Sequence, residues 1–172
     1  MNSKSTSREF CELSIELLEQ SMIKLRHCLA QLSEQQLWWR PQPSLNSVGN
    51  LCVHLAGNLR QWGIVPFSDA NDERDREREF DSEIRIAKSN VLQRLENTVS
   101  ESKQLWLDLD PETLQQPVTI QGFDVTFMHA ISHTSSHFVG HTHQIIMLTR
   151  MQLGDGYRFQ WSPEQGSGSL PI

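Results

Sequence analysis

The sequence lacks any apolar run near the ~18–20 residues that a membrane-spanning helix needs, so no membrane partner is expected. Cysteine is scarce, with three residues, an odd number, and no Cys-x-x-Cys motif. This argues against a disulfide framework and favours a reducing, cytoplasmic compartment. Residues 1–8 are polar, unlike the start of a signal peptide.

Positive charge is also limited. Lys and Arg total 15 against 21 Asp and Glu, which gives a formal net charge of −6. A nucleic-acid binder would carry a basic face, so no nucleic-acid partner is expected. Most of the excess negative charge lies in residues 69–83. We interpret this acidic stretch as a solvated linker, and the alternative is a lid that attracts metal ions.

Several catalytic motifs are missing. There is no Gly-rich phosphate loop and no Gly-x-Ser-x-Gly nucleophile elbow, which argues against those nucleotide-binding and hydrolase classes. No helical segment contains Glu-x-x-His, so a carboxylate-bridged di-iron bundle is not expected.

Helical periodicity is what the sequence does contain. Apolar residues recur at steps of three and four in residues 7–32, 46–62, 83–106 and 126–153. Asn46 or Ser47 is expected to cap the second segment, and Gly154 to end the fourth. The inward stripe of the first segment is predicted to contain Leu13, Leu17, Leu18, Leu25, Cys28, Leu29 and Leu32.

These segments predict an all-α protein, a four-helix bundle, in one domain spanning residues 1–172. The long connection 65–80 would permit a crossover between helices. Short β-prone runs on either side of Gln121-Gly122 predict a small hairpin before the last helix. The Gly/Ser-rich tail, residues 164–172, is expected to be flexible. Cys28 and Cys52 lie within apolar patterns and are expected to be core residues.

Histidines are concentrated in the last helical segment. Four of them repeat every four residues, at His129, His133, His137 and His141. Each step of four turns by about 40° and rises about 6 Å, so neighbouring pairs can share one metal ion whereas the first and last cannot.

The pair most suited to a metal lies on the inner face. His137 and His141 fall on the apolar stripe, and His54 lies at the edge of the apolar face of the second segment. Together they would supply three imidazole nitrogens, which suit Zn, Ni, Cu or Fe and leave open positions for water or substrate. A buried histidine without a metal would instead be a hydrogen-bonded core residue.

Three segments carry a resemblance to a known family. Residues 46–60 resemble the second helix of the DinB-like (damage-inducible protein B) superfamily, closest to a branch described only as a domain of unknown function. Residues 74–80 resemble its Arg-x-Arg-x-x-Glu-Phe segment, and residues 137–145 followed by Arg150 resemble its last helix. The departure is at Thr142-His143, where that branch usually has Val-Gly, so local packing or a dimer contact is expected to differ.

The resemblance implies an up-down-down-up four-helix bundle with a divalent metal on His54, His137 and His141. The match at Gln144 selects His137 and His141 over the pair that begins at His133. Related enzymes activate a low-molecular-weight thiol, bacillithiol or mycothiol, for transfer to a small-molecule electrophile. The resemblance therefore implies a metal-dependent thiol transferase or isomerase using Zn or Ni, with Fe as a further candidate, or a hydrolase that activates water, and also a homodimer.

The rival hypothesis is a non-catalytic, stress-related binding or scaffold protein whose metal is structural or absent. Side chains around the expected site have two interpretations each. His133, Asn50 and Asn58 would orient a ligand or simply line the site. Arg60 and Arg150 would hold a substrate carboxylate or pair with the acidic stretch. Trp38 and Trp39 would form an aromatic rim or pack a loop over the core.

Overall fold

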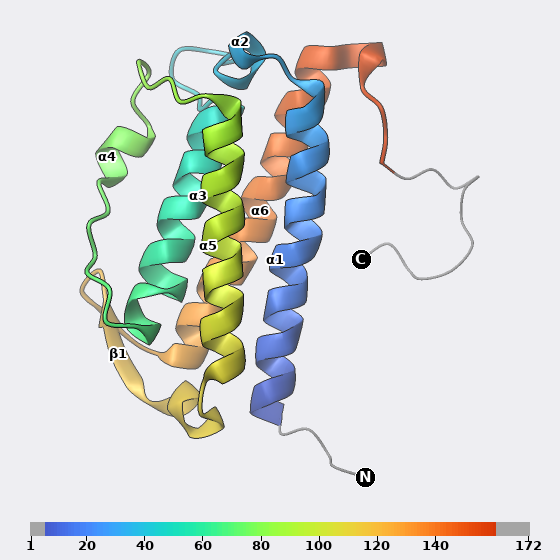
Figure 1. Cartoon of the computed structure of the whole chain (residues 1–172). Helices are drawn as coiled ribbons and strands as arrows, with labels where there is room; N and C mark the ends of the chain where they lie inside the picture. Colours follow the sequence, from blue (N-terminus) through green and yellow to red (C-terminus); the bar gives the residue numbers. More distant parts are fainter. Residues whose placement is uncertain (1–5, 161–172) are drawn as a thin grey trace, which may run out of the picture.

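Four long helices dominate the computed structural model, which describes residues 6–160 (Figure 1). They are α1 (Thr6–Gln31), α3 (Val48–Gly63), α5 (Lys88–Asp108) and α6 (Phe127–Leu153). The short elements are α2 (Glu34–Leu37), η1 (Val65–Phe67), α4 (Arg76–Glu79), η2 (Pro111–Gln115), β1 (Pro117–Ile120), β2 (Phe123–Thr126) and η3 (Gly154–Gly156). The predicted all-α class is confirmed. The tail at residues 164–172 lies outside the described residues.

The long helices pack side by side around one main hydrophobic core. Helix α1 contacts α5 and α6, and α3 contacts the same two helices from the other side. In Figure 1, α1 and α6 run upward whereas α3 and α5 run downward, and α4 lies against the outer side of α3. This arrangement places α3 between α6 and α4. No helix among the described residues is long and apolar enough to cross a membrane.

Helix ends follow the expected capping chemistry. The hydroxyl of Ser47 accepts a hydrogen bond from the Asn50 amide, and the Asn50 side chain accepts one from the Ser47 amide, which forms a capping box at the start of α3. Thr126 caps the start of α6, and Gly154 terminates this helix with a φ of 51°. A positive φ favours glycine, so the predicted end of α6 is confirmed.

The hairpin is also confirmed. Strands β1 and β2 pair antiparallel, and the two residues between them, Gln121 and Gly122, have φ values of 53° and 80°. Two successive positive φ values form the tight turn whose twist suits a hairpin. The Gln121 side chain also accepts a hydrogen bond from the Trp62 indole (3.3 Å), which ties the hairpin to α3.

Two sequence predictions about helices are wrong. Leu13 and Leu17 were placed on the inward stripe of α1, but they are 56% and 39% exposed because Cys11, Ile15 and Leu18 face the core instead. Helix α5 begins at Lys88 rather than near residue 83. The indole of Trp38 donates to the backbone carbonyl of Ile86, and the Ala87 backbone is extended, so the helix cannot begin earlier. The burial of Cys28 and Cys52 is confirmed.

Candidate metal centre

Histidines from two helices converge where α3 faces α6. His54 on α3 and His137 and His141 on α6 each present a ring nitrogen, and these atoms lie within 4.8 Å of one another. The Nε2 atoms of His54 and His137 lie 2.9 Å apart. His54 is buried, whereas the other two rings are half-buried. The cluster therefore has a closed side on α3 and a partly open side on α6.

Hydrogen bonds fix which nitrogen of His54 is free. Its Nδ1 lies 2.9 Å from Glu79 Oε2. An ionised carboxylate only accepts hydrogen bonds, so Nδ1 carries the proton and Nε2 presents its lone pair toward His137. Arg74 Nη2 also lies 3.1 Å from this Nδ1. A protonated nitrogen cannot accept, so we regard that approach as a contact beside the hydrogen bond.

His141 is held in the same way. Its Nδ1 lies 2.8 Å from the side-chain oxygen of Gln144, one turn further along α6. Because an amide oxygen is an acceptor, Nδ1–H donates to it and Nε2 is left with a lone pair. Gln144 therefore contacts the candidate ligand, as expected for a residue that orients it.

Glu79 is the centre of a buried ion pair. Arg74 Nε and Nη2 donate to its two carboxylate oxygens at 2.7 and 2.8 Å, and both side chains are only 5–6% exposed. Burial alone would raise the pKa of the Glu79 carboxyl, but the hydrogen bonds and charges of Arg74 and His54 outweigh it and lower that pKa. The carboxylate therefore stays ionised and continues to hold the His54 proton.

A hydrogen-bonded chain extends outward from this pair. Arg74 Nη1 donates to the Gln61 side-chain oxygen at 2.7 Å, and Gln61 Nε2 donates to Asp72 at 2.6 Å. Residues from α3 and from the connection that leads to α4 thus alternate along one network. This network fixes the position of Arg74, which in turn fixes Glu79 and the ring of His54.

Two residues of α3 make the approach of α4 possible. A Cβ at Gly57 would overlap Glu79 Oε1, so this glycine leaves the space that the carboxylate occupies. The Asn50 amide donates to the backbone carbonyls of Glu79 and Asp81 at 2.9 and 3.1 Å. Arg40 donates to the Asn50 side-chain oxygen at 2.9 Å. Asn50 therefore acts on the site through the backbone around Glu79, and within residues 6–160 its side chain makes no hydrogen bond to a histidine ring.

Burial favours the neutral form of the three rings at His133, His137 and His141. Burial, followed by the charges of His141 and His54, lowers the pKa of His137 to about 3. Burial also lowers the pKa of His141, partly opposed by the Gln144 hydrogen bond, and the pKa of His133, where His129 adds to the effect. Neutral imidazole is the form that binds metals.

The residues present fit a transition-metal ion. Three neutral imidazoles are borderline donors that suit Zn, Ni, Cu or Fe better than Mg or Ca. Nitrogens bound to one Zn at ~2.0–2.1 Å lie roughly 2.9 Å apart at a right angle and roughly 3.4 Å apart in a tetrahedron. The His54–His137 separation of 2.9 Å falls at the lower end of that range. His54 and His141 also each donate from Nδ1 to an oxygen acceptor, as metal-binding histidines usually do from the nitrogen that does not bind the metal.

The other candidate residues lie around the cluster without joining it. The ring of His133 packs against Trp62 with centroids 4.2 Å apart and stacks on His137 at 5.8 Å. Asn58 accepts a hydrogen bond from Thr134 (2.9 Å), so it links α3 to α6 and does not orient a histidine ring.

The arginine candidates do not reach the site. Arg60 is exposed and lies 3.7 Å from Glu101 on α5, so neither a substrate role nor pairing with the acidic stretch is supported. Arg150 lies over the rings of Tyr157 and Phe159 instead.

The sequence pattern does not reveal one buried residue of the site. It predicts a solvated linker for the acidic stretch, yet Glu79 within that stretch is 4% exposed, as buried as His54, and contacts the His54 ring. The signal was the Arg-x-Arg-x-x-Glu-Phe resemblance, whose first Arg and Glu are the paired residues Arg74 and Glu79. The remaining acidic residues of the stretch are exposed, as predicted for a linker.

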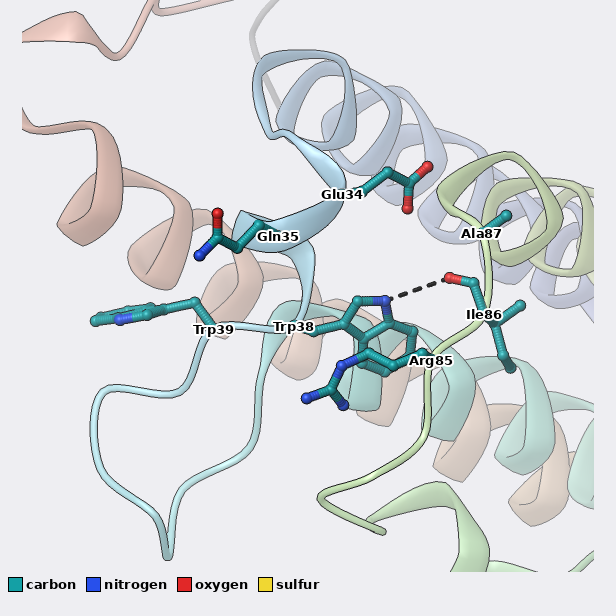
Figure 2. Close-up of a pocket in the computed structure, with 7 residues that line it drawn as sticks. All are labelled: Glu34, Gln35, Trp38, Trp39, Arg85, Ile86 and Ala87. Atoms are coloured by element: carbon teal, nitrogen blue, oxygen red, sulfur yellow. Dashed lines mark hydrogen bonds between the residues drawn. The ribbon is translucent and has the colours of Figure 1, made fainter.

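A separate cavity lies between α2 and the segment that leads into α5 (Figure 2). Its volume is about 490 Å³, and the side chains that line it are Glu34, Gln35, Trp38, Trp39, Arg85, Ile86 and Ala87. Trp38 is buried and packs over the core, as one of the two interpretations of the Trp pair predicts, whereas Trp39 is 39% exposed and lines the cavity. The cavity contains no histidine and is distinct from the metal centre.

Comparison with known proteins shows the family and the fold. No curated protein matches the chain. It is similar to a crystal structure titled as the conserved protein of a locus from Enterococcus faecalis, with 21% identity, a TM-score of 0.70, and coverage of 83% of this chain and 96% of that one. At this identity the likeness shows the fold alone. The model of the family DUF1572, proteins of unknown function, matches residues 5–164. The chain therefore belongs to the DUF1572 family.

Proposed function

We propose that this protein is a DinB-like, metal-dependent enzyme in which His54, His137 and His141 hold one divalent transition metal. Zn and Ni are the leading candidates and Fe is a further one. One observation supports this most directly: three imidazole nitrogens from two helices lie within 4.8 Å of one another. The oxygen acceptors on the Nδ1 atoms of His54 and His141 add support, because they leave the Nε2 lone pair of each ring free to bind a metal.

The fold proposed for this site is a four-helix bundle of up-down-down-up topology. The contacts of α1 and α3 with both α5 and α6, and the directions of these helices in Figure 1, support it. In such a bundle, ligands from facing helices meet in the interior.

The proposed reaction is nucleophilic attack by a thiolate on a small-molecule electrophile, with hydrolysis as a variant. A bound divalent metal lowers the pKa of a thiol or a water molecule, so that a nucleophile forms at neutral pH. Glu79 holds the proton on Nδ1 of His54, and Gln144 holds the corresponding proton of His141. The substrate and thiol would enter from the α6 side, because Glu79 and Arg74 close the α3 side.

Metal analysis of the purified, untagged protein tests the metal site. We expect about one equivalent of a transition metal by elemental mass spectrometry, since one set of three ligands binds one ion. His137→Ala should lose it, whereas His143→Ala, an exposed histidine on the same helix, should keep it. An absence of metal from the wild type, even after incubation with Zn and Ni, would refute the proposal.

Cobalt substitution tests the enzymatic part. A low-molecular-weight thiol that binds the metal should change the visible spectrum of the cobalt protein, and His137→Ala should show no such change. A protein that binds cobalt but responds to neither thiol nor a change of pH would favour the rival scaffold role. A homodimer is likewise proposed, and light scattering of the purified protein tests it.

A further inference from the structure

Histidines continue along α6 beyond the three proposed ligands. His129 and His133 precede His137 at the same spacing of four, and neither belongs to the cluster on α3 and α6. The rings of His133 and His137 are stacked, with centroids 5.8 Å apart and planes inclined by 19°, and those of His137 and His141 are 4.4 Å apart. The rings of His133, His137 and His141 therefore form a row along α6, and His129 lies one helical turn before His133, toward the start of the helix.

The outer end of this row opens into a groove. The groove has a volume of about 510 Å³, and the residues that line it are Phe10, Thr126, Met128, His129, Ser132, His133 and Ser136. His129 is exposed and His133 is half-buried, with Trp62 holding its ring from the α3 side. Within residues 6–160 neither ring makes a hydrogen bond to another side chain or to the backbone, so their nitrogens remain available to a ligand.

The chemistry of the groove selects the kind of ligand. Helix α6 contains no Asp, Glu, Lys or Arg between Phe127 and Thr149. A hard cation such as Mg²⁺ or Ca²⁺ would find no carboxylate there, whereas Zn²⁺, Ni²⁺ or Co²⁺ accepts imidazole nitrogen. Side chains four residues apart on a helix are neighbours, so His129 and His133 can chelate one such ion.

We propose that His129 and His133 form an outer transition-metal site through which the ion reaches His54, His137 and His141. The role in metal entry rests on the proposed function, because the ion is delivered to the inner site proposed there. The outer site itself does not depend on it. The four histidines form three overlapping i, i+4 pairs, which begin at His129, His133 and His137. The ion can therefore bind the next imidazole before it dissociates from the previous one. Such a row lowers the barrier to entry and to exit alike, and it leaves the affinity of the inner site unchanged.

The equilibrium test is a Zn²⁺ titration of the whole chain by calorimetry. The wild type should bind one equivalent tightly and a second weakly, because the outer site has two ligands and the inner site three. His129→Gln should lose only the weak equivalent, and His143→Gln, a matched change of an exposed histidine on the same helix, should retain both. Both side chains are exposed, so neither change should disturb folding. A weak equivalent that survives His129→Gln would overturn the outer site.

The kinetic test is stopped-flow mixing with Co²⁺, followed by its visible absorption, and the release of bound Co²⁺ to excess chelator. His129→Gln should slow loading and release several-fold and by the same factor, with an unchanged final amplitude, while His143→Gln behaves as the wild type. Unchanged rates in His129→Gln would overturn the role in entry. A weak site without any tight one would overturn the proposed function and the entry role together, and would leave the outer site established.

Discussion

The buried carboxylate of Glu79 gives the sharpest test of how the site is built. Glu79→Gln keeps the size of the side chain but removes the charge that compensates Arg74, whose side chain is only 6% exposed. Removing one partner of a buried pair costs about 3–5 kcal/mol in unfolding free energy. A change of 3 kcal/mol lowers the melting temperature of a chain of this size by roughly 6–12 °C.

The same substitution also acts on the metal. Without an ionised acceptor, the Nδ1 proton of His54 is held less firmly and the ring is less well oriented. Loss of such a partner typically weakens metal affinity by about 10–100-fold. The matched control is Glu77→Gln, an identical change at an exposed position on the same short helix. It should change the free energy of unfolding by less than about 0.5 kcal/mol.

The assays are chemical denaturation of the metal-free proteins and Zn²⁺ competition against a chelator of known affinity. If the Glu79 and Glu77 variants unfold at the same denaturant concentration, the buried ion pair contributes nothing measurable and the reasoning fails. If stability falls but Zn²⁺ affinity does not, Glu79 supports the fold without positioning His54.

Two further predictions follow from the same geometry. Gly57→Ala should lower both stability and metal affinity, because a Cβ there overlaps Glu79 Oε1, whereas Gly140→Ala on the open face of α6 should be neutral or slightly stabilising in thermal melts. Since the pKa of His137 is lowered to about 3 in the fold, the unfolded chain binds a proton below about pH 6.5 that the folded chain does not. The metal-free protein should therefore lose stability as pH falls from 7.5 to 5.5, by at most about 1.4 kcal/mol per pH unit for this group. Urea denaturation measures this loss, and a wild type and His137→Ala with equal pH dependence would contradict it.

The elements that sequence analysis predicted well are those set by local chemistry. Helices α1, α3 and α6 begin and end within two residues of the predicted positions, because apolar periodicity, the Ser47 cap and Gly154 are all local signals. The hairpin was recognised from the β-prone runs around Gln121-Gly122 for the same reason. The start of α5 was not, because it depends on the hydrogen bond between Trp38 and Ile86, which are 48 residues apart.

In the candidate site, too, local patterns predict some residues and miss others. Spacing along one helix predicts that His137 and His141 are neighbours, and the apolar face of α3 together with the family resemblance places His54 opposite them. Helix α4 has only four residues, too few to show periodicity, so nothing local distinguishes Glu79 from the exposed acidic residues around it. Its burial arises from the packing of α4 on α3, which no local pattern encodes.

The buried polar residues His54, Arg74 and Glu79 serve either metal binding or the packing of the fold, and their contribution to stability distinguishes the two. Buried ion pairs often add little stability compared with apolar residues of similar volume, although breaking one is costly. If the set serves metal binding, the triple variant His54→Leu, Arg74→Met, Glu79→Leu should be at least as stable as the metal-free wild type and bind no metal at the inner site. Arg74→Met alone should be destabilised, because it leaves Glu79 buried and unpaired. Denaturation of the three proteins distinguishes these cases. A triple variant less stable than the single one would mean that the polar network itself specifies the packing of α4 on α3, and metal binding would then not be needed to explain why these charges are buried.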